Sequence, residues 1–178
     1  MSLNHDWIIL AYTLPSEPSR KRVAIWRRLR KLGAVYLNEG FWFLPNTATM
    51  AKTVTNLISE VEHQEGTASA FIATDLQPDQ KARLQARFNQ ARDGEYAELR
   101  RQCERFLAHV ARESKTGNFD FSQVEELEED LEKRVRLFGQ IGERDVFGSA
   151  ERETVERMVE ECKEAMARYT EQAYEKAH

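Results

Sequence analysis

The chain has 178 residues, of which 41% are hydrophobic and 31% are charged, and its formal net charge is -4 at pH 7. These values exclude a disordered polyelectrolyte, because the apolar content can build a core and the charges alternate in sign. They also exclude a helical membrane span, since no apolar run reaches the length of about 20 residues that a bilayer requires. The first residues lack the basic and apolar regions of a secretory signal, so we expect a cytoplasmic protein.

The first 75 residues predict four strands and two helices in the order β-α-β-β-α-β. Apolar runs bounded by turn residues indicate strands, and apolar side chains spaced by three or four indicate helices. The predicted strands cover 7–14, 34–37, 41–44 and 68–74, and the predicted helices cover 19–32 and 47–62. Asn38-Glu39-Gly40 predicts a hairpin turn. This order is typical of a ferredoxin-like fold, with an antiparallel sheet and two helices on one face. The hairpin argues against a small doubly wound sheet.

The predicted helix over 19–32 is strongly basic, although the protein as a whole is acidic. An apolar stripe is expected at Val23, Trp26 (or Ile25), Leu29 and Leu32. Seven cations lie mostly off that stripe: Arg20, Lys21, Arg22, Arg27, Arg28, Arg30 and Lys31. Such a cluster indicates an anionic partner, with nucleic-acid phosphate the first candidate. The alternative is a solvated helix face whose Arg and Lys stems cover apolar surface.

Three aromatic residues lie close to these cations in the sequence. Trp26, Phe41 and Trp42 could stack on bases, because aromatic and basic side chains are interleaved in many nucleic-acid sites. Trp26 falls on the predicted apolar stripe, however, and Trp42 falls in a predicted strand. Packing in the core is therefore their expected role.

From residue 77 onward the pattern is helical. Gly94 is expected to interrupt or kink the first helix, and Gly139, Gly142 and Gly148 predict a loop. The last helix carries a heptad-like seam at Val155, Val159, Cys162, Met166, Tyr169 and Ala173. We expect this seam to pack both on the helix near residue 131 and on a second copy of the chain, as a homodimer. The predicted class is α+β, with a ferredoxin-like domain over 1–76 and a helical tail or bundle over 77–178.

The sequence predicts no catalytic residue, no metal site and no cofactor. Cys103 and Cys162 form no CxxC pair and are expected to be small buried hydrophobes. Ferredoxin-like CRISPR-associated nucleases place an aspartate at the end of the first strand, where this chain has Thr13 and Leu14. Without that carboxylate a divalent cation would not be held near a phosphate, so nuclease activity is not expected. The acidic run over 125–130 predicts a solvated helix face, paired with Lys133 and Arg134.

Two long segments together resemble the N-terminal domain of the chromate resistance regulator ChrB. They read WIILAYTLPSEPSRKRVAIWRRLRKLGAVYLNEGFWFLP and EYAELRRQCERFLAHVARESKTGNFDFSQVEELEEDLEKRVRLFGQIGERDVFG. The resemblance implies a transcription regulator whose basic region binds DNA, with Arg20, Arg22, Arg27, Arg28 and Lys31 as the contacting residues. Longer family members carry a further C-terminal domain associated with chromate sensing, which this chain is expected to lack.

We therefore interpret the chain as a non-enzymatic DNA-binding regulator or accessory domain. Two other classes remain open. In an oxyanion or small-molecule sensor, the cations at the start of the first helix would hold the anion near the positive end of the helix dipole. In a structural module, the heptad-like tail would bind a partner protein instead.

Overall fold

The structure, a computed structural model, describes residues 6–37, 40–117 and 119–177. Within these ranges the chain forms a four-stranded antiparallel sheet and five helices, which confirms the predicted α+β class. It divides into two compact units, Met1–Arg87 and Phe88–His178. The helix α3 (Pro78–Thr116) begins two residues after the predicted domain boundary and runs from the first unit into the second. Across the described residues, none of the helices is both long and apolar enough to cross a membrane.

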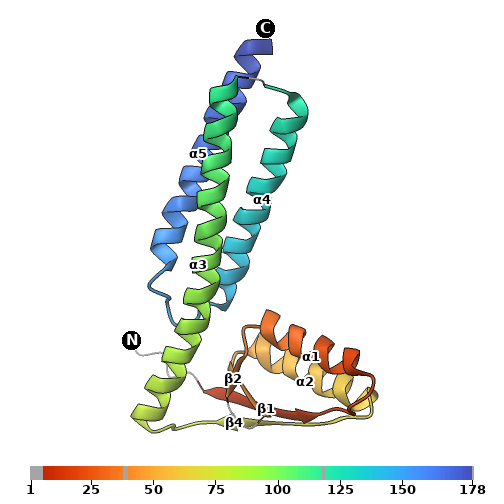
Figure 1. Ribbon diagram of the computed structural model, residues 1–178. Coiled ribbons are helices and arrows are strands. Elements are labelled where there is room, and N and C mark those ends of the chain that lie inside the picture. Colours follow the sequence, from red (N-terminus) through yellow and green to blue (C-terminus); the bar gives the residue numbers. More distant parts are fainter. Residues whose placement is uncertain (1–5, 38–39, 118, 178) are drawn as a thin grey trace. The chain divides into compact units, whose positions relative to one another are not determined.

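The sheet of the first unit has the strand order β2-β3-β1-β4 (Figure 1). Its strands are β1 (Trp7–Thr13), β2 (Val35–Leu37), β3 (Phe41–Pro45) and β4 (Thr67–Ala73). Each lies within one residue of its predicted bounds. The predicted hairpin turn between β2 and β3 falls partly on residues 38–39, which lie outside the described residues.

Helices α1 (Ser19–Lys31) and α2 (Ala48–His63) cover one face of this sheet (Figure 1). Alternation along β1 turns Ile8 and Leu10 toward the helices, where they are at most 3% exposed. Leu10 pairs in register with Trp42 of β3, so both side chains enter the same core. The residues of that core are Ile8, Leu10, Ile25, Leu29, Ala34, Trp42, Leu44, Val54, Leu57 and Val61.

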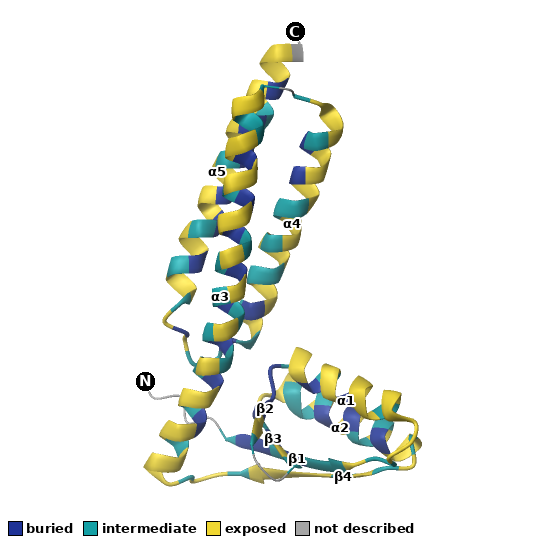
Figure 2. Ribbon diagram, viewed as in Figure 1, coloured by how far each residue is buried: buried dark blue, intermediate teal, exposed yellow. Residues whose placement is uncertain are grey.

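The second unit is a bundle of three helices: the part of α3 that follows Arg87, α4 (Phe121–Arg144) and α5 (Arg152–Ala177). Buried positions recur along each of them (Figure 2). All six seam residues of α5 are at most 7% exposed within this single chain. They pack with α3 and α4 in one core whose largest members are Tyr96, Tyr169 and Phe106. The predicted packing of the seam within the chain is therefore confirmed. The predicted packing on a second copy of the chain, as a homodimer, stays a prediction.

The predicted interruption of the helix at Gly94 and the predicted loop at Gly139 and Gly142 are wrong. α3 continues through Gly94, and α4 continues through Gly139 and Gly142 to Arg144. Glycine costs a helix only about 1 kcal/mol relative to alanine, and the buried apolar stripes on either side outweigh that cost. Gly148 does lie in the turn before α5, with φ of 75°. Cys103 and Cys162 are fully buried in the bundle, as predicted, and a hydrogen bond with the Cys103 side chain, followed by burial, raises the pKa of Cys162.

A buried polar cluster joins α3 to the turn between α4 and α5. The Tyr96 hydroxyl donates to Asp145 Oδ2 at 3.3 Å, and the Ser149 amide donates to Asp145 Oδ1 at 2.8 Å. Asp145 is 8% exposed and also lies 3.9 Å from the guanidinium of Arg152. These contacts satisfy a carboxylate that would otherwise be costly to bury.

We expect the free energy of unfolding of the second unit to fall as the pH rises above about 10. Burial, and then the charge of Asp145, raise the pKa of Tyr96 from 10.0 to about 12. Between these two values an unfolded tyrosine loses its proton while the folded one keeps it. The contribution of the Tyr96 phenol to stability is therefore fully present below the pKa that it has in the unfolded chain. It is lost as the pH rises through the pKa that it has in the folded protein. Urea melts from about pH 9 to about pH 11.5 should show this fall in the parent protein. A fall of the same size in Tyr96→Phe would contradict this assignment.

Candidate nucleic-acid interface

The basic helix α1 is held on the sheet by a narrow buried face. Ile25 and Leu29 have no exposed surface, while Lys21 and Arg28 flank them at helical spacing and are partly buried. The predicted stripe is wrong at Val23, which is 42% exposed, and of the two alternatives Trp26 and Ile25 the structure confirms Ile25, because Trp26 is 49% exposed. The spacing of apolar residues in the sequence does not reveal this whole face, because Lys21 and Arg28 belong to it and cover the core with their aliphatic stems.

Lys21 and Arg28 are engaged inside the first unit. Lys21 Nζ donates to the Gln64 carbonyl at 3.4 Å and lies 3.9 Å from the Glu65 carboxylate. Arg28 forms an ion pair with Glu60 of α2. These two cations link α1 to α2 and to the turn that follows α2. Carboxylates of the same unit therefore compensate their charge.

The other five cations are exposed, and none of them forms an ion pair with any residue that the structure describes. They are Arg20, Arg22, Arg27, Arg30 and Lys31. Arg20, Arg27 and Lys31 follow one line along the helix, because residues seven and eleven positions apart share a face. The exposed side chain of Trp26 lies beside Arg30, whose guanidinium carbon is 5.7 Å from the centroid of the Trp26 ring. We call these five cations and Trp26 the basic surface of α1.

Nothing within α1 neutralises this surface. The helix has no acidic residue in its first turn, and Arg28, Arg30 and Lys31 occupy its last turn, where they offset the negative end of the helix dipole. Uncompensated cations on one face of a helix produce a local positive potential even in an acidic protein. Such a surface attracts a polyanion and places several charges along one direction.

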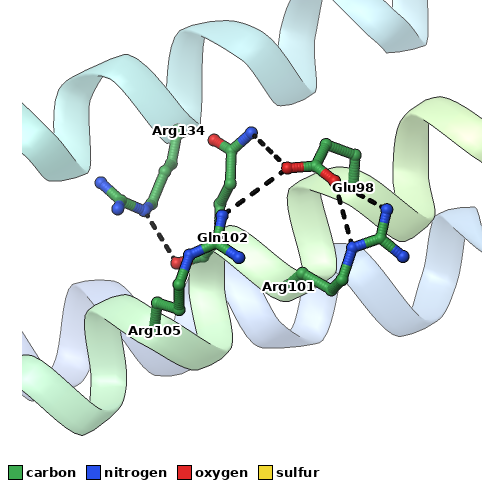
Figure 3. Close-up of polar contacts among 5 residues, drawn as sticks. All are labelled: Glu98, Arg101, Gln102, Arg105 and Arg134. Atoms are coloured by element: carbon green, nitrogen blue, oxygen red, sulfur yellow. Dashed lines mark hydrogen bonds and ion pairs between the residues drawn. The ribbon is translucent and has the colours of Figure 1, made fainter.

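The arginines of α3 are arranged differently. Arg101 donates to Glu98 at 2.6 Å, and Arg105 lies 3.6 Å from the same carboxylate (Figure 3). Arg134 of α4 donates to the Gln102 carbonyl at 3.2 Å and lies over the Phe106 ring. Acidic partners therefore neutralise much of the charge along this part of the bundle. The predicted pairing of the acidic run over 125–130 is confirmed, since Lys133 and Arg134 each contact Asp130.

The structure thus leaves five of the seven predicted binding residues exposed along α1, with Arg20, Arg27 and Lys31 on one side of the helix, and turns Lys21 and Arg28 inward. It adds Trp26, which sequence reasoning had assigned to the core. The core assignment of Trp42 is confirmed, since this residue is 3% exposed and its ring lies 5.1 Å from that of Tyr36. Phe41 is 39% exposed and points to the opposite face of the sheet.

Comparison of the sequence with known proteins identifies the family of this chain. A family model described as "Protein ChrB, N-terminal" matches residues 22–178. Protein ChrB of Cupriavidus metallidurans (strain ATCC 43123 / DSM 2839 / NBRC 102507 / CH34) is 29% identical over 92 residues, which cover 52% of this chain and 28% of the relative. The chain therefore matches less than a third of the length of that relative.

Proposed function

The chain belongs to the ChrB N-terminal family, and from this membership we propose that it is a chromate-resistance type of regulator that binds DNA through the basic surface of α1. One observation carries the DNA-binding part of the proposal. Five exposed cations without acidic partners among the described residues lie on a single helix of a chain whose net charge is -4. Three of them, Arg20, Arg27 and Lys31, follow one line, and a partner with regularly spaced negative charges gains the most from it, because each phosphate contact releases a counterion.

The geometry also suits duplex DNA. An exposed helix face can enter the major groove, which is wide enough to admit an α-helix. The buried Ile25 and Leu29 hold α1 rigidly against the sheet, so the cations are presented without ordering a flexible segment. A homodimer, which we also propose, would present this helix twice to two half-sites.

The β-α-β-β-α-β order and the strand order β2-β3-β1-β4 support a ferredoxin-like assignment for the first unit. We propose that the chain acts by binding and not by catalysis.

Binding to duplex DNA, measured by fluorescence anisotropy at several salt concentrations, tests this function. The duplexes are the DNA upstream of the protein's own coding sequence and a scrambled one of equal length. With three to five phosphate contacts, affinity should fall roughly 40- to 500-fold between about 50 and 200 mM salt. Arg27→Ala should weaken binding to both duplexes and lower the salt slope by about one.

The matched control is Arg28→Ala combined with Glu60→Ala, which removes an internal ion pair and leaves the net charge unchanged. It should leave the salt slope unchanged. Absence of binding at low salt would refute the DNA-binding part of the proposal. Binding of an inorganic oxyanion in its place would favour the sensor alternative.

A further inference from the structure

The face of the sheet opposite α1 and α2 carries a groove of about 530 Å³. Its lining comes from the strands, from the segment before α3 and from the first turns of α3, all within the first unit. The lining residues are Ile9, Leu37, Phe43, Leu76, Gln80, Arg83, Leu84 and Arg87. This volume lies in the range of small-molecule sites, roughly 300 to 1,000 Å³.

An apolar row runs across this face of the sheet, and two of its members, Ile9 and Phe43, form the floor of the groove. Ile9 of β1 pairs in register with Phe43 of β3 on one side and with Phe71 of β4 on the other. Residues paired across antiparallel strands point to the same face, so these three side chains stand together on the side away from the core that α1 covers. Phe71 is 59% exposed at the end of this row. The floor offers a flat body both an aliphatic and an aromatic surface.

The rim of the groove is cationic. Arg83 and Arg87 are four residues apart on α3, so they project from the same side of the helix, one turn after Gln80. Both arginines are exposed, and neither forms an ion pair with a residue in the described part of the chain. None of the described residues that line the groove carries a carboxylate. Guanidinium groups in such a position can hold a carboxylate through two parallel hydrogen bonds.

We propose that this groove binds a small organic anion with a flat apolar body, of the aromatic carboxylate class. The ring would lie against Ile9 and Phe43, and the carboxylate would reach Arg83 or Arg87. A hydrated inorganic oxyanion would gain nothing from the apolar floor, and a neutral aromatic molecule would leave the two cations unused. The site lies on the other face of the sheet from α1, and the proposal does not depend on DNA binding.

Isothermal titration calorimetry with three probes tests this assignment. The probes are 2-naphthoate, its neutral analogue 2-naphthalenemethanol, and inorganic phosphate. We expect 2-naphthoate to bind about tenfold more tightly than the alcohol, because a hydrogen bond to a charged group is worth roughly 1.5 kcal/mol or more. Phosphate alone should show no binding at the same concentrations.

Variants then locate the probe. Arg83→Gln and Arg87→Gln together should lower the affinity for 2-naphthoate to that for the alcohol, without affecting the fold, since both side chains are exposed. Arg157→Gln makes the same exchange on the exposed side of α5 and should leave binding unchanged. Phe43→Leu removes the aromatic floor and should weaken both naphthalene probes.

Three results would overturn the proposal. The first is no binding of 2-naphthoate at millimolar concentration. The second is equal affinity for acid and alcohol, or an affinity for the acid that the double arginine variant leaves intact. The third is displacement of 2-naphthoate by a single-stranded oligonucleotide whose binding depends on the same two arginines. That outcome would make this face of the sheet a nucleic-acid surface, since exposed aromatic side chains also stack on bases.

Discussion

Val159→Glu is expected to destabilise the three-helix bundle strongly. Val159 is 3% exposed in the middle of the α5 seam, among side chains of the bundle core. A carboxylate at this position would be buried without a partner, and such changes cost roughly 4 kcal/mol or more. For a unit of this size the loss corresponds to a fall in melting temperature of about 15 °C or more. Circular dichroism should show it directly, because most of the helix lies in the bundle.

The matched control introduces the same residue two positions earlier. Arg157 is exposed on the outer side of α5, so Arg157→Glu should change the free energy of unfolding by less than about 0.5 kcal/mol. Light scattering on both variants separates packing within the chain from packing between chains. A smaller particle with an unchanged melting temperature would place the seam between two copies, contrary to its burial within one chain. Unchanged mass and melting would contradict the seam itself.

The elements of the first unit could be predicted from the sequence because their signals are local. Strands 41–45 and 67–73 are apolar runs that end at turn residues, and α1 ends near Gly33, whose φ of 79° suits glycine. The seam of α5 is equally plain, since six residues recur at heptad spacing. For α5, periodicity alone identifies which side is buried.

The sequence predictions that are wrong, and the groove that the sequence did not predict, all depend on tertiary packing. Trp26 is as apolar as a core residue, but Ile25 and Leu29 form the buried side of α1, flanked by the ion-paired cations Lys21 and Arg28. Gly94 and Gly139 looked like breaks, but packing of the helices they interrupt outweighs the local cost. The groove had no local signal at all, because Ile9 and Arg83 meet only through the tertiary fold.

Reversing two charges on the basic surface of α1 is expected to have the largest effect on DNA binding. Arg27→Glu combined with Arg30→Glu replaces two exposed cations by two anions on the face that would meet phosphate. Affinity for duplex DNA should fall roughly a thousandfold at low salt, because two attractive contacts are lost and two repulsions are created. The remaining salt slope should fall by about two. Neither side chain is buried, so the melting temperature should stay close to that of the parent protein.

The control for this experiment carries the same charge change elsewhere. Arg157→Glu with Arg168→Glu on α5 lowers the net charge by the same amount, and Arg168 gives up only an exposed contact with Glu164 at 3.7 Å. Long-range repulsion between an acidic protein and DNA would weaken both double variants equally, whereas direct contact weakens only the α1 variant. A thousandfold loss confined to α1 at about 50 mM salt, shrinking as salt screens the repulsion, is the signature of phosphate contacts. Equal losses in the two double variants would mean that overall charge, and not the basic surface of α1, governs binding.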